Sequence, residues 1–275
     1  MQTQVLSWRI AVFAVVLALI FTNKIAHAET IVDLELVLAV DVSHSMDAAE
    51  QRLQRSGYVA AFRHRDIIRA IETGPNGRIA VAYLEWGEQS FQALVIPWRI
   101  IASASDAKAF ANELERRRIT VAKQTSISGA LTTATTLILK NDIKSLRQVI
   151  DVSGDGPNNS GYPVTAARDA TLRQGIVING LPFVIDRPDD ISSFFAVPDI
   201  DRYYTECVIG GPGAFTMRVS NKDEFETAIR RKLLLEIAGA QPPGRPLVHK
   251  AQFRTTRSNY DCLVGEKKWD SFQLE

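Results

Sequence analysis

The 275-residue sequence has only two cysteines and four histidines, and its charges nearly cancel, with 32 Lys and Arg against 31 Asp and Glu. A net charge of +1 gives no sign of the positive surface that nucleic-acid-binding proteins use. The cysteines lack metal-ligand spacing and have no histidine nearby, which argues against a thiol-based active site. Repeats and low-complexity tracts are absent. With 46% hydrophobic and 23% charged residues, the composition is that of an ordinary globular protein.

Common catalytic signatures are also missing. No G-x-S-x-G motif is present, because Val152-Ser153-Gly154 lacks the glycine two positions before the serine. No G-x-G-x-x-G or G-x-x-x-x-G-K-[ST] segment opens a helix after a strand. The basic cluster at residues 116–118 is interpreted as a solvated helix end.

The N-terminus has the pattern of an export signal. Arg9 precedes an apolar run over residues 10–21, and Ala26-His27-Ala28 follows as an A-x-A cleavage signature. That run is shorter than the about 20 residues that span a bilayer, and no later segment is long and apolar enough to do so. We predict a signal peptide over residues 1–28 and a soluble mature chain from Glu29, with an uncleaved anchor as the alternative. The bacterial periplasm is the expected location, with an extracellular one as the alternative.

Export gives the two cysteines a meaning. An oxidising compartment favours a disulfide between Cys207 and Cys262, the single pair available. It would close a loop of about 55 residues and contribute roughly 4 kcal/mol by the chain-entropy argument. Two unpaired buried thiols are the alternative.

Short apolar runs alternate with amphipathic helical stretches along most of the chain. Strands are expected at residues 31–40, 79–86, 91–97, 148–152, 176–181 and 215–219. Helices are expected at residues 46–72, 106–117, 126–140, 163–174, 189–195 and 221–237. The link between the second and third strands has only four residues, which suits a hairpin and not a parallel crossover.

This order predicts an α/β fold. Strands alternating with helices imply a doubly wound, mostly parallel sheet with helices on both faces, and the hairpin implies one antiparallel edge strand. The globular domain is expected to cover residues 29–239. Residues 240–275 read as a Pro- and Gly-containing linker and a polar tail, too small to fold alone, which the disulfide would tie back.

Small polar and acidic residues follow two of the predicted strands. Asp41, Ser43 and Ser45 form a D-x-S-x-S loop after the first strand, and Asp155 lies in the turn after the strand at 148–152. Thr125 stands at the start of a helix and adds a third hydroxyl. Two carboxylates and three hydroxyls suit magnesium, with manganese or calcium as alternatives, and neutral hydroxyl ligands leave the ion electrophilic. Such an ion favours an incoming carboxylate.

The order of these five residues resembles the metal-ion-dependent adhesion site of von Willebrand factor type A domains. That family's pattern is D-x-S-x-S, then T, then D, at the carboxyl ends of a doubly wound sheet. The resemblance covers residues 31–238, and T-S-I-S-G-A-L at 125–131 matches the family's helix start. Segments 175–186 and 206–215 resemble a bacterial exported subgroup of unknown role.

The resemblance implies a role for each residue. Ser43 and Ser45 would ligate the metal directly, and Thr125 directly or through water. Asp41 and Asp155 would act largely through water and hydrogen bonds. The protein is therefore expected to be a non-enzymatic module that docks a carboxylate of a protein or peptide partner on the metal. His44, inside the same loop, is expected to face solvent.

Three other interpretations stay open. The polar residues could simply cap helices and satisfy turns. The segment Gly154 to Asn159 also resembles the G-D-G-x-N-D motif of magnesium-dependent phosphatases of the haloacid dehalogenase type. Those enzymes need an acid two positions after the aspartate of the first strand, where this chain has Ser43. The third interpretation is a metal-free scaffold that acts through its tail, residues 247–275.

Overall fold

The computed structural model describes residues 30–184, 197–239, 248–250 and 260–273. The expected signal peptide and the expected helix at 189–195 lie outside the described residues. The chain divides into two units, residues 1–30 and 31–275, and the sheet and its helices belong to the second. No helix in the described ranges has the length and apolar character needed to cross a membrane.

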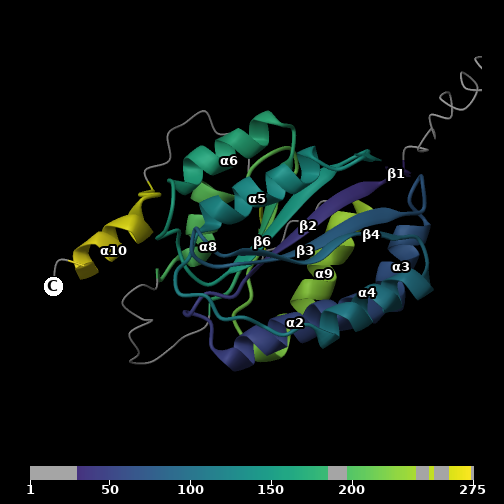
Figure 1. The fold of residues 1–275 in the computed structure, drawn as a ribbon, viewed down its shortest axis with the longest axis horizontal. Coiled ribbons are helices and arrows are strands. Elements are labelled where there is room, and N and C mark those ends of the chain that lie inside the picture. Colours follow the sequence, from purple (N-terminus) through teal and green to yellow (C-terminus); the bar gives the residue numbers. More distant parts are fainter. Residues whose placement is uncertain (1–29, 185–196, 240–247, 251–259, 274–275) are drawn as a thin grey trace, which may run out of the picture. The chain divides into compact units, whose positions relative to one another are not determined.

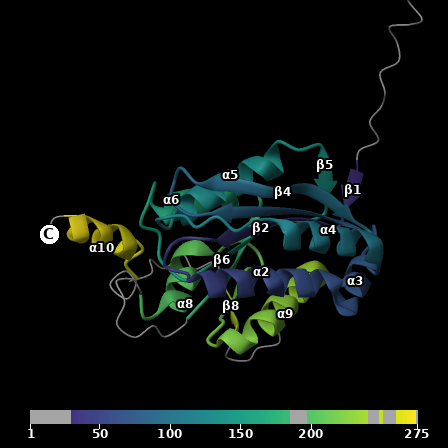
Figure 2. The same cartoon turned by 60° about the horizontal axis from the view of Figure 1, so that its bottom comes forward.

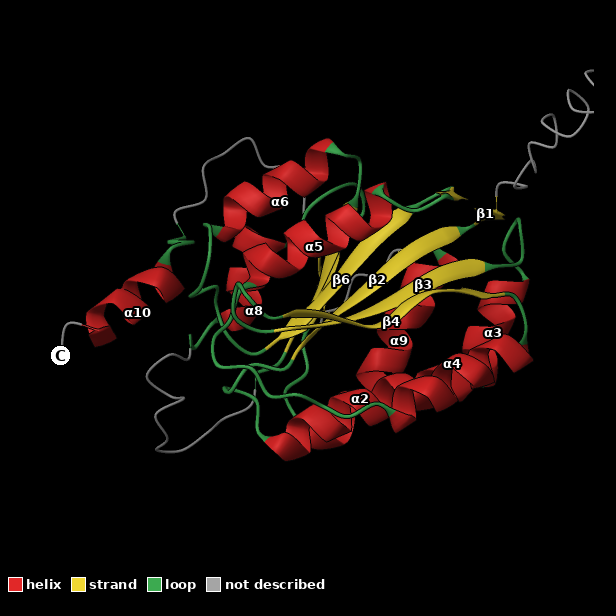
Figure 3. Ribbon diagram, viewed as in Figure 1, coloured by secondary structure: helices red, strands yellow, loops and turns green. Residues whose placement is uncertain are grey.

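The centre of the fold is a seven-stranded sheet (Figures 1 and 3). Its strands, in spatial order, are β4 (Gln92–Ile101), β3 (Ile79–Trp86), β2 (Leu34–Asp41), β6 (Gln148–Gly154), β7 (Val177–Pro182), β8 (Phe215–Met217) and β9 (Val248–Lys250). Strands β3, β2, β6, β7 and β8 are parallel to one another, and β4 pairs antiparallel with β3. The predicted doubly wound fold and its antiparallel edge strand are confirmed.

Helices cover both faces of this sheet (Figure 2). One face carries α2 (Ala48–Arg63), α3 (Arg65–Glu72), α4 (Ala104–Arg116) and α9 (Phe225–Ala238), with η2 (Lys222–Glu224) preceding α9. The other face carries α5 (Ile127–Leu139), α6 (Val164–Arg173), α8 (Ile200–Tyr203) and the π-helical turn η1 (Tyr204–Val208). The tail adds α10 (Val264–Gln273), and a small second sheet pairs β1 (Thr30–Val32) with β5 (Ile143–Ser145).

Burial on both faces explains why the central strands are apolar almost throughout. Every residue of β2 and β3 is buried. In β2, Leu36 and Leu38 pack into the core under α2 and α9, whereas Val37 and Ala39 pack into the core under α5. Each fully buried aliphatic side chain contributes about 1.5–3 kcal/mol relative to exposure, so packing on both faces stabilises the strand.

Two predicted elements are divided in the structure. The helix expected at 46–72 breaks at His64, whose backbone is extended at φ −81° and ψ 132°. Its Nδ1 accepts a hydrogen bond from the backbone N–H of Asp66 and so caps α3. The strand expected at 31–40 is interrupted at Asp33, whose carboxylate accepts hydrogen bonds from the backbone and side chain of Asn76. At both breaks a polar side chain accepts a hydrogen bond from a backbone N–H.

The tail contributes more regular structure than its polar composition indicates. Strand β9 adds a second antiparallel edge by pairing with β8, and α10 follows it. Sequence reasoning missed both elements, because three residues of strand and ten of helix carry too little periodicity to be recognised alone.

Candidate metal-binding site

The two loops that carry the candidate ligands lie side by side. Strands β2 and β6 pair in parallel, with Val40 opposite Ser153, so the loops after them leave the same edge of the sheet. The chain runs outward from β2 to β3 on one side and enters β6 on the other, which makes this the switch point of the sheet. Ligand sites of open α/β sheets lie at such points.

The D-x-S-x-S loop connects directly to the loop after β6. The Asp41 carboxylate is fully buried, and its Oδ1 accepts a hydrogen bond from the Ser43 backbone at 2.7 Å. The Ser43 and Ser45 hydroxyl oxygens lie 2.9 Å apart, and Ser45 Oγ donates to Asp155 Oδ1 at 2.6 Å. His44, between the serines, is exposed to solvent, as predicted. The structure therefore brings four of the five predicted residues into one chain of contacts.

Thr125 reaches this group through the loop after β6. Its backbone N–H donates to Asn159 Oδ1 at 2.9 Å, and the Asn159 N–H donates back to the Thr125 carbonyl at 2.8 Å. A Cβ on Gly156 would lie 3.6 Å from Thr125 Oγ1 and 4.0 Å from Ser45 Oγ. The hydroxyls of Thr125 and Ser45 thus face the same glycine. Asn159, which ends the phosphatase-like segment, thus has a structural role as the partner of Thr125.

Asp41 is electrostatically unusual. Burial, together with the nearby Asp155 carboxylate, raises the pKa of Asp41 well above its usual range. Its second oxygen, Oδ2, is buried without a hydrogen-bond partner among the described residues. An uncompensated buried carboxylate is costly, and a cation close by is the usual remedy.

Tyr204 also reaches the site, although no local sequence pattern marks it. A Cβ on Gly154 would lie 2.6 Å from Asp41 Oδ2 and 2.8 Å from the Tyr204 hydroxyl, so both oxygens converge on one glycine. The Tyr204 hydroxyl is fully buried and has no hydrogen-bond partner in the described part of the chain. Burial and the charges of Asp41 and Asp155 raise the pKa of Tyr204.

The donor set fits a small hard cation. Adjacent ligands of an octahedral magnesium lie about 2.9 Å apart, given magnesium–oxygen distances of about 2.1 Å. The hydroxyl oxygens of Ser43 and Ser45, the two direct ligands that the resemblance implies, lie 2.9 Å apart. Within the described ranges, no group of three or more His, Cys, Asp or Glu side chains could hold a metal. The candidate set has only two carboxylates, and its other donors are hydroxyls.

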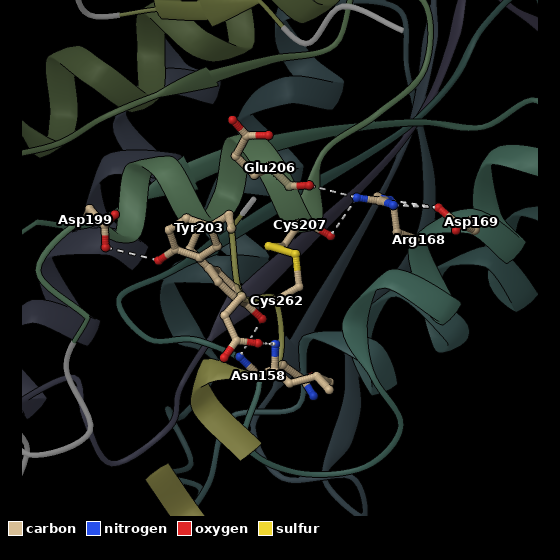
Figure 4. The surroundings of a disulfide bond; sticks show 11 residues. Asn158, Arg168, Asp169, Asp199, Tyr203, Glu206, Cys207 and Cys262 are labelled. Carbon is tan, nitrogen blue, oxygen red and sulfur yellow. Dashed lines mark hydrogen bonds and ion pairs between the residues drawn. A yellow bond between two sulfur atoms is a disulfide. The ribbon is translucent and has the colours of Figure 1, made fainter. Parts of the chain in front are cut away.

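The tail is tied to the domain by a disulfide, whose surroundings Figure 4 shows. The expected disulfide joins Cys207 in η1 to Cys262, just before α10. Asn158 lies three residues after Asp155, and its side chain donates a hydrogen bond at 2.8 Å to Glu266 in the first turn of α10. The Asn158 backbone N–H donates to the Tyr203 hydroxyl at 3.1 Å. Asn158 therefore links the loop after β6 to α8, through Tyr203, and to the tail, through Glu266.

Several solved structures have a similar fold. The pilus adhesin SpaC from Lactobacillus rhamnosus GG aligns with a TM-score of 0.54 and 12% identity over 75% of this chain and 31% of that one. Proximal thread matrix protein 1 from the mussel byssus, with a zinc-occupied metal-ion-dependent adhesion site, aligns with a TM-score of 0.52 and 15% identity over 80% and 48%. A von Willebrand factor type A protein from Catenulispora acidiphila gives 0.48 and 11% over 75% and 43%.

This chain therefore spans between about a third and a half of the length of these proteins. A comparison with curated proteins finds no match. A family model described as "Protein of unknown function (DUF1194)" matches residues 31–241. The fold is that of a von Willebrand factor type A-like domain.

Proposed function

Because this chain belongs to the DUF1194 family and has a von Willebrand factor type A-like fold, we propose that it is an exported, non-enzymatic binding module. It docks a carboxylate of a protein or peptide partner on a divalent metal ion. The domain covers residues 29–239, and the mature protein works in the bacterial periplasm or outside the cell. The names of two proteins of similar fold support this proposal, since one is an adhesin and the other has a metal-occupied adhesion site.

The observation that carries the proposal is the convergence of oxygens around Ser45. Ser43, Ser45 and Thr125 would hold the ion through hydroxyls, with Asp41 and Asp155 supporting them through hydrogen bonds and water. Magnesium suits this set of oxygen donors, with manganese or calcium as alternatives. The bound ion would supply an electrophilic centre for an incoming carboxylate.

Burial of Asp41 argues against the phosphatase alternative. A nucleophilic aspartate must approach phosphorus directly, whereas Asp41 is fully buried and uses Oδ1 to hold the Ser43 backbone. The position two residues later, which must hold the general acid of such an enzyme, is a serine. Neither feature suits catalysis, and both suit a site that holds an ion.

Calorimetric titration with magnesium tests this function. We expect Asp41→Ala to weaken magnesium binding about 10- to 100-fold, the usual effect of losing a residue that supports the ligands. The matched control is Asp142→Ala, which removes an exposed carboxylate outside the site and should leave the affinity unchanged. Equal affinity in wild type and Asp41→Ala would refute the site.

Two further measurements address the alternatives. If the protein hydrolyses a generic aryl phosphate and Asp41→Asn abolishes this activity, the phosphatase hypothesis is correct instead. Partner capture from the native envelope tests the scaffold interpretation. That interpretation is supported if capture persists with a chelator and in the Ser43→Ala, Ser45→Ala variant but is lost when residues 247–275 are deleted.

A further inference from the structure

A basic groove lies between α2 and the segment that connects α4 to α5. Its volume is about 560 Å³, and its lining includes four arginines, Arg52, Arg55, Arg117 and Arg118, against one carboxylate, Glu115. Chain-wide charge is balanced, so this concentration of positive charge is local.

Internal ion pairs neutralise part of this charge. Arg55 pairs with Glu85, and Arg117 pairs with Glu113 at 2.8 Å, whereas the groove's carboxylate, Glu115, is itself paired with Arg63 at 2.6 Å. Arg52 and Arg118 are exposed and make no ion pair with any residue that the structure describes. The groove therefore keeps two uncompensated guanidinium groups.

Arg55 supplies a second, independent sign of a ligand. Its side chain is only 7% exposed, and its two terminal nitrogens are used by Glu85 and by the carbonyls of Leu114 and Arg117. Its Nε is buried and has no hydrogen-bond partner within the described ranges. A buried cationic donor without an acceptor is costly, and a carboxylate oxygen is the acceptor that suits it best.

The groove opens directly beside the D-x-S-x-S loop. Gln51 lines the groove, and its side chain donates to the carbonyls of Val42 and Ser43 at 3.2 and 3.3 Å. On the other wall, Val121 is 54% exposed, and the next residue, Ala122, donates its N–H to the Val42 carbonyl at 2.8 Å. Both walls of the groove therefore contact the loop that carries Ser43.

We propose that this groove binds an acidic peptide segment, whose carboxylates meet Arg52, Arg55 and Arg118. This proposal rests on the proposed function, because the acidic segment would flank the carboxylate that docks on the metal next to Ser43. The expected ligand is thus a stretch of several acidic residues, and not a single aspartate or glutamate.

Fluorescence anisotropy with a labelled hexaglutamate peptide tests the groove, with magnesium present and at low salt. We expect Arg52→Ala, Arg118→Ala to bind about tenfold more weakly than the wild type, and the difference to shrink as salt is added. Both arginines are exposed, so the double variant should fold normally. The matched control is Arg65→Ala, Arg173→Ala, which removes the same charge from exposed positions outside the groove and should bind normally.

Other outcomes overturn the groove. These are equal losses in the variant and the control, equal binding of hexaglutamine, or no binding of hexaglutamate up to about millimolar concentration. A chelator separates this proposal from the metal site. If the double variant weakens peptide binding and a chelator does not, the groove is supported and docking on the metal is refuted. If a chelator weakens peptide binding and the double variant does not, docking on the metal is supported and the groove is refuted.

Discussion

Gly154 is the residue around which the candidate site closes. Its missing side chain leaves room for Asp41 Oδ2 and the Tyr204 hydroxyl, which would lie 2.6 and 2.8 Å from an added Cβ. Real side chains do not approach a Cβ so closely, and neither oxygen sits on a flexible chain end that could move aside, because both residues are fully buried. The glycine is therefore required by close approach.

The first prediction follows at this scale. Gly154→Ala should lower the free energy of unfolding by about 1–3 kcal/mol, because it overpacks a buried polar pocket, and it should weaken magnesium binding. Denaturant unfolding and calorimetric titration measure the two effects. Gly156→Ala is the control for stability, because its Cβ would make an ordinary contact at 3.6 Å with Thr125 Oγ1. If Gly156→Ala lowers the free energy of unfolding as much as Gly154→Ala does, the steric explanation is wrong.

Sequence reasoning found the residues of the site that stand in local motifs and missed those that reach it through the fold. Asp41, Ser43 and Ser45 share one loop, and Asp155 follows a recognisable strand. Tyr204 reaches the same point from a π-helical turn far along the chain, and no local pattern marks it. Such contacts depend on how η1 packs against β7 and α6, which sequence spacing does not reveal.

At the scale of elements, the disulfide decides how the tail is held. Cys207–Cys262 spans 55 residues and lies next to the Asn158–Glu266 hydrogen bond and the packing of Tyr260 against Tyr203, with ring centroids 6.1 Å apart. Burial raises the pKa of Glu266, so its carboxyl is partly withdrawn from water at this contact. The attachment of α10 thus combines a covalent bond with a few polar contacts.

The second prediction concerns this attachment. Cys207→Ser, Cys262→Ser should lower the free energy of unfolding by about 2–4 kcal/mol, and limited proteolysis should cut the tail first. Reduction of the wild type should have the same effect, which separates loss of the bond from the effect of new hydroxyls. A tail that stays resistant to protease in both cases would show that the noncovalent contacts alone hold it.

Element boundaries were predictable where apolar periodicity is strong and not where one polar side chain decides. The buried strands and α5 follow their patterns closely. The break between α2 and α3 depends on His64, which caps α3 and contacts Arg230 on α9 at 2.7 Å. Because that contact arises from the packing of helices, the sequence pattern alone predicts one continuous helix.

The molecule as a whole carries an ionised cluster in its core. Lys232 on α9 lies 2.5 Å from both Asp151 on β6 and Glu236, and Asn179 on β7 donates to Glu236 at 3.0 Å. All four residues are at most 4% exposed. Burial and the Asp151 charge raise the pKa of Glu236 to about 7, and burial also raises the pKa of Asp151. Two carboxyls share one lysine, so one of them tends to keep its proton.

The pH dependence of stability is the third prediction. Folded Glu236 keeps its proton to about pH 7, whereas the unfolded carboxyl loses it near its ordinary value of 4.5. The folded state therefore binds more protons between these values, and the free energy of unfolding should fall as pH rises through this window, by on the order of 3 kcal/mol.

Glu236→Gln isolates this effect. The variant should be less sensitive to pH between about 5 and 7 than the wild type, as measured by denaturant unfolding at several pH values. Glu224→Gln, which changes an exposed carboxylate before α9, should keep the wild-type slope. Equal slopes in all three proteins would show that the cluster does not titrate in this range.

The reciprocal hydrogen bonds between Thr125 and Asn159 have a consequence for the speed and cost of binding. They join the segment before α5, which carries Thr125, to the loop after β6, which carries Asp155, before any ion or partner arrives, so little conformational entropy remains to be lost at that moment. Such pre-organisation favours fast association that is limited by diffusion and charge and not by loop ordering. Discrimination among partners then falls to dissociation rates, which the surfaces around the ion would set.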